Sequence, residues 1–256
     1  MKKPAIILIH GLRGDHHGLL ELAECLQEAG YETYVPDLPG YGIEQALRDQ
    51  SLKGYANWLH EYVEKQKFET KPIILGHSMG SIIVSHYLEA YPEDCSKTAV
   101  FLAPIIRTEK GQKRSNRLAK IFLRSLKLLS GHSRYRLMKS RFVSFWISHI
   151  LTYDRTRQKY IDEQHYMYSG EFTSTRSLMN DVQLSMSEQT ICPKNRKVLY
   201  CMGDHDRLTK VKNVKKNIAN CPNATLKVIK KTGHLLNYEF PQKTAQVITQ
   251  FLDKKS

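Results

Sequence analysis

The chain has no apolar run that approaches the roughly 20 residues a membrane-spanning helix needs. It opens MKKPAIILIHG, and the two lysines resemble the start of a secretion signal. However, the apolar stretch from Ala5 to Ile9 is too short for a signal core, and no small-residue cleavage site follows it. We therefore interpret the opening as a first β-strand and expect a soluble or peripheral protein.

Cysteine is scarce and shows no pairing pattern. The five cysteines are odd in number, widely spread and without C-x-x-C spacing: Cys25, Cys95, Cys192, Cys201 and Cys221. This pattern argues against a disulfide framework and a zinc site, so a reducing cytoplasm is the simplest compartment. Glycine fingerprints that bind nucleotide phosphates are also absent, and no cofactor is expected.

What the chain does contain is an alternation of strand and helix signals. Six short β-rich runs are predicted strands: PAIILI, YETYVP, KPIIL, KTAVFLA, KVLYCM and TLKVI. Helical patterns are found at 18–29, 52–64, 78–90 and 243–252. This alternation predicts an α/β fold, with a mostly parallel sheet covered by helices on both faces.

One long stretch, from residue 105 to 188, interrupts this alternation. It has no convincing strand, and its pattern is helical and basic. We predict a core formed by residues 1–104 and 189–256, with 105–188 inserted as a helical cap. Between residues 105 and 160 there are fifteen lysines and arginines against two acidic residues, Glu109 and Asp154. The local net charge of +13 in this part of the cap nearly equals the chain's net charge of +14.

A serine between two glycines follows the third predicted strand, in the sequence Gly76-His77-Ser78-Met79-Gly80. A strand, this pentapeptide and then a helix form a sharp turn that lifts the serine above the sheet edge. Side chains at the two flanking positions would collide with neighbouring backbone, which explains the glycines. Ser78 is therefore a candidate nucleophile.

A serine hydroxyl needs a base to remove its proton, and the base needs a carboxylate to orient it. Two later predicted strands end in suitable loops: KVLYCM runs into Gly203-Asp204-His205-Asp206, and TLKVI leads to Gly233-His234. Both loops leave the carboxyl ends of parallel strands, the sheet edge where Ser78 is expected. His234 is the predicted base, and Asp204 and Asp206 are both candidate acids.

The developing negative charge on a reacting carbonyl oxygen needs hydrogen-bond donors. The first predicted strand ends in His10-Gly11-Leu12-Arg13-Gly14, whose glycines allow the Leu12 N–H to turn inward. Together with the Met79 N–H, it would form a two-donor oxyanion hole.

The chain resembles the α/β-hydrolase family over about residues 1–104 and 190–256. The motifs that carry this resemblance are HGLRG, DLPGYG, GHSMG, GDHD and the late GH. The resemblance implies a Ser-His-Asp hydrolase core with a variable cap. In this family the acid stands three residues after the glycine that ends its strand, which favours Asp206 over Asp204. The predicted catalytic residues are thus Ser78, Asp206 and His234.

The other histidines have simpler interpretations. We expect His10 to shape the oxyanion loop and His77 to fill the turn at the serine. His16, His17 and His205 are interpreted as loop residues, because we find no carboxylate or cysteine at ligand spacing beside them. No metal site is predicted, and Asp37 is taken as a turn residue.

The predicted reaction is hydrolysis of carboxylic esters through an acyl-enzyme on Ser78. The resemblance is greatest to monoacylglycerol lipases and lysophospholipases, which implies acyl lipid substrates. A thioesterase or a carbon–carbon bond hydrolase would use the same triad, and a non-catalytic binding module is a further alternative. Epoxide and haloalkane hydrolysis require an aspartate at the position of Ser78 and are excluded.

The basic cap predicts an anionic partner. On a helical wheel Arg117, Lys120, Arg124 and Lys127 share one arc, opposite Leu118, Phe122, Leu123, Leu126 and Leu129. An anionic membrane surface, an anionic substrate or a merely solvated face would each explain this pattern. No nucleic acid is expected, because no reading motif accompanies the charge. We therefore expect an acyl ester substrate and peripheral membrane contact through the cap.

Overall fold

The computed structural model describes residues 3–167 and 175–254. Six strands form one parallel sheet in the order β2-β1-β3-β4-β5-β6. Their bounds are β1 Ile6–Ile9, β2 Thr33–Tyr34, β3 Ile73–His77, β4 Thr98–Leu102, β5 Lys197–Gly203 and β6 Ala224–Ile229. All six predicted strands are present, and the parallel α/β sheet is confirmed.

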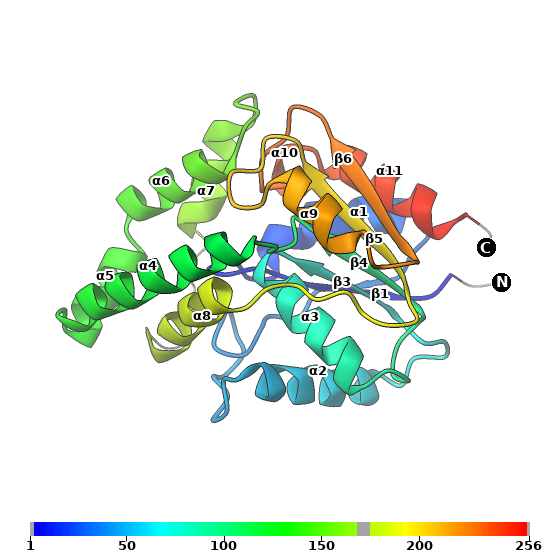
Figure 1. Cartoon of the computed structure of the whole chain (residues 1–256), viewed down its shortest axis with the longest axis horizontal. Helices are drawn as coiled ribbons and strands as arrows, with labels where there is room; N and C mark the ends of the chain where they lie inside the picture. Colours follow the sequence, from blue (N-terminus) through cyan, green and yellow to red (C-terminus); the bar gives the residue numbers. More distant parts are fainter. Residues whose placement is uncertain (1–2, 168–174, 255–256) are drawn as a thin grey trace.

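Helices cover both faces of the sheet (Figure 1). Those of the core are α1 His17–Glu28, α2 Leu52–Gln66, α3 Met79–Ala90, α9 Val211–Ile218, α10 Leu236–Glu239 and α11 Pro241–Leu252. Helices α9 and α10 were not predicted from the sequence. Between β4 and β5 the described residues form α4 Glu109–Lys127, α5 Gly131–Met138, α6 Arg141–Leu151, α7 Gln158–Met167 and α8 Thr175–Ser187.

Strand β1 shows why both faces need covering. Ile6 and Leu8 pack into a core cluster with residues of α1 and α11, whereas Ile7 and Ile9 pack into the opposite cluster with α2 and α3. Successive side chains of a strand point to opposite faces, so a continuous run of apolar residues must be buried on both. The short run IILI therefore specifies a central strand in a three-layer arrangement.

Helices α4 to α8, between β4 and β5 in the chain, lie at the end of the sheet away from both termini (Figure 1). They fall within the predicted cap. Helix α4 begins where the Thr108 hydroxyl accepts a hydrogen bond from the Gly111 N–H at 3.1 Å. Only Ala119 and Leu126 of α4 are buried, so much of its apolar arc is exposed. Across the described residues, no helix has both the length and the apolarity needed to cross a bilayer.

One expectation about cysteine was wrong. Cys192 and Cys221 form a disulfide, with their Cα atoms 6.4 Å apart, while Cys25, Cys95 and Cys201 are free thiols. The paired cysteines lie 29 residues apart, and no local spacing marks them in the sequence. The cysteine pattern therefore no longer supports a reducing compartment.

Candidate active site

Ser78 occupies a strained turn between β3 and α3. Its φ of +53° and ψ of −118° lie outside the regions that side-chain-bearing residues favour. A Cβ on Gly76 would stand 2.6 Å from the Gly80 carbonyl oxygen, and one on Gly80 would stand 2.4 Å from that of Ile9. Backbone packing thus requires both glycines. The strand extends to His77 and the helix begins at Met79, so the turn is tighter than the sequence suggested.

The three predicted catalytic side chains meet at the carboxyl edge of the sheet. His234 Nε2 lies 2.8 Å from Ser78 Oγ, and His234 Nδ1 lies 2.8 Å from Asp206 Oδ2. All three residues are buried. A carboxylate beside Nδ1 holds the proton on that nitrogen, which leaves Nε2 free to accept one from the serine. The arrangement is thus competent for nucleophilic catalysis.

The carboxylate of Asp206 is held by the loop that carries it. Its Oδ1 accepts hydrogen bonds from the backbone N–H groups of Leu208 at 2.8 Å and Thr209 at 3.0 Å. Burial alone would raise the pKa of Asp206, but the interaction with His234 and these N–H groups outweigh it and lower that pKa below its usual range. Asp206 therefore remains an anion at neutral pH.

Asp204, the alternative acid, faces a different partner. Its Oδ1 lies 2.7 Å from Nδ1 of His205, a more exposed histidine, and accepts a hydrogen bond from the Thr232 N–H at 3.3 Å. The geometry therefore brings Asp206, and not Asp204, to His234.

The predicted oxyanion donors lie in segments next to Ser78. A Cβ on Gly11 would come within 2.9 Å of the Ser78 Cβ, so the loop after β1 packs directly against the serine. The backbone N–H groups of Leu12 and Met79 donate to no acceptor among the described residues. Their role as oxyanion donors stays a prediction.

His10 and His77 hold the surrounding backbone. His10 donates from Nδ1 to the Gly11 carbonyl at 2.9 Å and accepts at Nε2 from the Leu38 N–H at 2.8 Å. His77 Nε2 lies 3.2 Å from the His234 carbonyl oxygen. Burial lowers the pKa of His10 to about 4 and, assisted by neighbouring His234, that of His77 to about 3. Both rings are neutral at pH 7, consistent with the structural roles expected of them.

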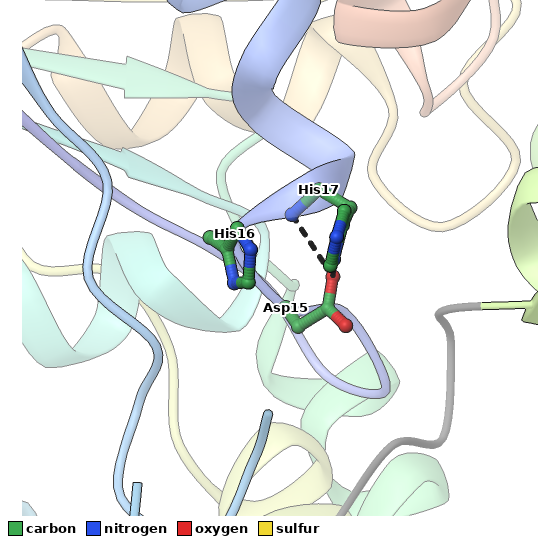
Figure 2. Close-up of side chains that lie close together, drawn as sticks. All are labelled: Asp15, His16 and His17. Atoms are coloured by element: carbon green, nitrogen blue, oxygen red, sulfur yellow. Dashed lines mark hydrogen bonds and ion pairs between the residues drawn. The ribbon is translucent and has the colours of Figure 1, made fainter. Parts of the chain in front are cut away.

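In the turn before α1, a carboxylate does lie beside His16 and His17, contrary to the sequence-based expectation. It belongs to Asp15, the preceding residue, and Figure 2 shows Asp15 turned toward His17. The Asp15 Oδ1 accepts from the His17 N–H at 3.0 Å, while His16 Nδ1 lies 2.9 Å from Asp37 Oδ1. These pairs account for both histidines as hydrogen-bonding groups of the turn.

A cavity of about 450 Å³ opens beside Ser78 and His234. Both the core and the cap contribute apolar side chains to its wall, among them Leu12, Leu19, Ile147, Ile150, Leu151, Met186 and Leu235. Its volume falls in the usual range for small-molecule sites, and its wall suits an acyl chain.

The family described as alpha/beta hydrolase fold matches residues 4–241. The chain belongs to this family. The monoacylglycerol lipase ABHD6 of Mus musculus is 26% identical over 274 residues, covering 98% of this chain and 76% of that protein. A thermostable monoacylglycerol lipase of a Bacillus species is 30% identical over 95 residues, covering 35% of this chain and 37% of that protein.

Among solved structures, an esterase from Thermogutta terrifontis matches with a TM-score of 0.77 and 18% identity, over 99% of this chain and 90% of that one. This likeness shows a shared fold. The α/β-hydrolase resemblance identified from the motifs is thus confirmed.

In this α/β hydrolase, hydrogen bonds join the cap to the loop that carries His234. The Leu151 carbonyl accepts a hydrogen bond from the His234 N–H at 2.7 Å. Buried Glu239 accepts from the N–H groups of Tyr153 at 3.0 Å and Asp154 at 2.8 Å, and its other oxygen accepts from Gly233 at 2.8 Å. Glu239 could not be singled out from the sequence, since a single acid within LNYE carries no motif.

Proposed function

We propose that this α/β hydrolase cleaves carboxylic esters through an acyl-enzyme on Ser78. The observation that carries the proposal is the continuous hydrogen-bonded chain from Ser78 Oγ through His234 to Asp206, with both contacts at 2.8 Å. Ser78 and His234 border a cavity with a largely apolar wall, where an ester can approach the serine.

The reaction follows from this geometry. His234 Nε2 takes the Ser78 proton while Oγ attacks the ester carbonyl carbon, and the N–H groups of Leu12 and Met79 stabilise the oxyanion. The intermediate collapses, and His234 returns the proton to the departing alcohol. Water then attacks the acyl-enzyme by the same steps, releasing the acid and restoring Ser78.

Acyl lipids, namely monoacylglycerols or lysophospholipids, are the substrates that we propose. Relatives named monoacylglycerol lipases support this choice, as does the apolar side of the cavity contributed by Ile147, Ile150 and Leu151 of α6. Burial of each methylene of an acyl chain in such a wall contributes about 0.8 kcal/mol.

Ser78→Ala tests the nucleophile. Wild-type protein should hydrolyse 4-nitrophenyl butyrate and react with a fluorophosphonate probe, and the variant should do neither. Ser115→Ala, which changes another serine of the same cavity wall, should still be labelled. Ester hydrolysis that persists in Ser78→Ala would refute the assignment, and a wild-type protein inert to esters, thioesters and the probe would favour a binding module.

We also propose that the outer face of the cap contacts anionic membranes. Large apolar side chains are exposed there, including Leu128 at 88%, Phe142 at 70% and Trp146 at 52%. Four exposed basic residues of α4 accompany them: Arg117, Lys120, Arg124 and Lys127. Each basic residue near an anionic surface contributes about 1 kcal/mol of attraction, which salt screens.

Changing these four residues to glutamate should abolish most binding to phosphatidylglycerol vesicles, and binding of the wild type should fall with increasing salt. The matched control makes the same change in net charge outside the cap, at Lys212, Lys215, Lys216 and Lys227. If both quadruple variants lose vesicle binding equally, net charge and not the cap determines it. If the cap variant binds vesicles like the wild type, the basic residues of α4 are merely solvated and do not contact the membrane.

A further inference from the structure

A buried arginine lies in the cavity with no counter-ion. Arg13 follows Leu12 in the loop after β1, lines the same cavity as Ser78 and is only 4% exposed. Its Nη2 donates to the Met138 carbonyl at 2.6 Å and, more weakly, to Ser144 Oγ at 3.4 Å. Its Nε and Nη1 have no partner, and none of the ion pairs between described residues includes it.

An unpaired buried charge is costly, so proteins rarely keep one without a partner. Burial lowers the pKa of Arg13 only to about 10, so the guanidinium is charged at pH 7. Arg107, in the wall of the same cavity, shows the usual solution: its Nη1 donates to the Glu188 carbonyl at 3.0 Å and its Nη2 to that of Ser185 at 2.7 Å. Arg13 keeps two donor nitrogens unused.

A second buried polar side chain, His165 of α7, also lines the cavity. Neither ring nitrogen of His165 has a hydrogen-bond partner among the residues that the structure describes. Burial, with the neighbouring charge of Arg13, lowers the pKa of His165 to about 3, so the neutral ring offers one N–H donor. Asp15 also lines the cavity, and its Oδ1 already accepts a hydrogen bond from the His17 N–H at 3.0 Å (Figure 2).

We propose that Arg13 and His165 form an anion-binding subsite within the ester cavity, and that the preferred substrate is an ester that also carries a carboxylate or phosphate. The proposal rests on the ester hydrolysis proposed above and specifies its substrate class. A guanidinium and a neutral imidazole together offer donors to an oxyanion in surroundings where water is largely excluded. The anion would stand either at the far end of the acyl group or on the alcohol.

The alternative role for Arg13 is structural. Its bond to the Met138 carbonyl joins the loop after β1 to the end of α5, so the side chain also connects core and cap. A purely structural arginine would affect charged and neutral esters alike. The ratio of kcat/KM between matched esters therefore separates the two roles.

For a carboxylate on the acyl side, we compare mono-4-nitrophenyl glutarate with 4-nitrophenyl valerate, which share chain length and leaving group. For a phosphate on the alcohol side, we compare palmitoylglycerol 3-phosphate with monopalmitoylglycerol. Arg13→Met should lower the anionic-to-neutral ratio of kcat/KM by about 10- to 100-fold in the pair that the subsite serves. His165→Phe should lower the same ratio less, because it removes a neutral donor.

Arg107→Met is the matched control, because it removes a cavity arginine whose donors are already used, and it should leave the ratio near the wild-type value. A fall confined to the glutarate pair identifies a carboxylate, and a fall confined to the phosphate pair identifies a phosphate. Arg13→Met with both ratios unchanged would overturn the subsite.

A binding measurement keeps this test separate from the reaction. Glutarate or glycerol 3-phosphate should raise the melting temperature of the wild type and leave that of Arg13→Met unaffected. If the wild type cleaves no ester, the proposed function fails while this comparison still decides the subsite. Equal shifts of the melting temperature in both proteins, or no shift in either, would refute the anion-binding subsite.

Discussion

Replacing Asp206 by asparagine should reverse the proton placement on His234. The Asp206 Oδ1 accepts hydrogen bonds from the N–H groups of Leu208 and Thr209, so an amide oxygen would remain there. The amide NH₂ would then occupy the position of Oδ2, 2.8 Å from His234 Nδ1. Because NH₂ is a donor, Nδ1 must become an acceptor and the proton must move to Nε2, where it blocks removal of the Ser78 proton.

The expected effect is large because the tautomer is wrong while the side-chain shape is kept. A change of this kind lowers kcat by about 10⁴-fold, equivalent to roughly 5.4 kcal/mol of transition-state stabilisation. KM should change little, since Asp206 does not line the cavity. The assay is the rate of 4-nitrophenyl butyrate hydrolysis, with the melting temperature measured in parallel to detect unfolding.

Asp204→Asn is the matched control, two residues earlier in the same loop. Its carboxylate pairs with His205 near the surface, so we expect kcat within about threefold of wild type. A loss in Asp204→Asn equal to that in Asp206→Asn, or an Asp206→Asn variant with more than about a tenth of wild-type kcat, would contradict the assignment of the acid.

Other predictions concern stability. Burial raises the pKa of Asp181 from 3.8 to about 6. Between pH 3.8 and about pH 6 the folded state therefore retains a proton that the unfolded state releases, so the stability of the fold decreases as pH rises through this range. Asp181→Asn should remove up to about 3 kcal/mol of this pH dependence, as measured by urea unfolding between pH 4 and 7. Gly80→Ala should lower the free energy of unfolding by about 2 kcal/mol or more, because its Cβ would meet backbone atoms. In Gly131→Ala the nearest atom to the new Cβ lies at 4.0 Å, so the melting temperature should be nearly unchanged. Glu239→Gln should lower stability by about 1 to 3 kcal/mol and the melting temperature with it, because one buried N–H group loses its acceptor.

The fold and the meeting of Ser78, Asp206 and His234 could be predicted because local chemistry specifies them. The run IILI is apolar at every position, as a strand buried on both faces requires. The glycines around Ser78 are required by contacts within one turn and with the adjacent strand. The positions of Asp206 and His234 follow from strand ends, which parallel topology brings to one edge.

The disulfide and the anion subsite depend on contacts that are remote in sequence. Cys192 and Cys221 meet only because the connection before β5 passes beside the end of α9, and their spacing matches no motif. Arg13 belongs to the quoted HGLRG motif, but only the folded cap determines that its Nε and Nη1 remain unpaired. The sequence predicted which groups would meet at Ser78 and could not reveal which polar groups would be left without partners.

The contacts that join core and cap explain this limit further. Some pairs of side chains join core and cap, such as Tyr55 with Asp181. Other core groups bind cap backbone: Arg13 binds the Met138 carbonyl, the His234 N–H binds that of Leu151, and Glu239 binds the N–H groups of Tyr153 and Asp154. A backbone partner requires no particular side chain, so these contacts leave no signature in the cap sequence. It follows that cap side chains facing the cavity or the solvent can change while the cap remains attached over Ser78. The specificity of this hydrolase is therefore to be sought in residues such as His165, which face the cavity without taking part in that attachment.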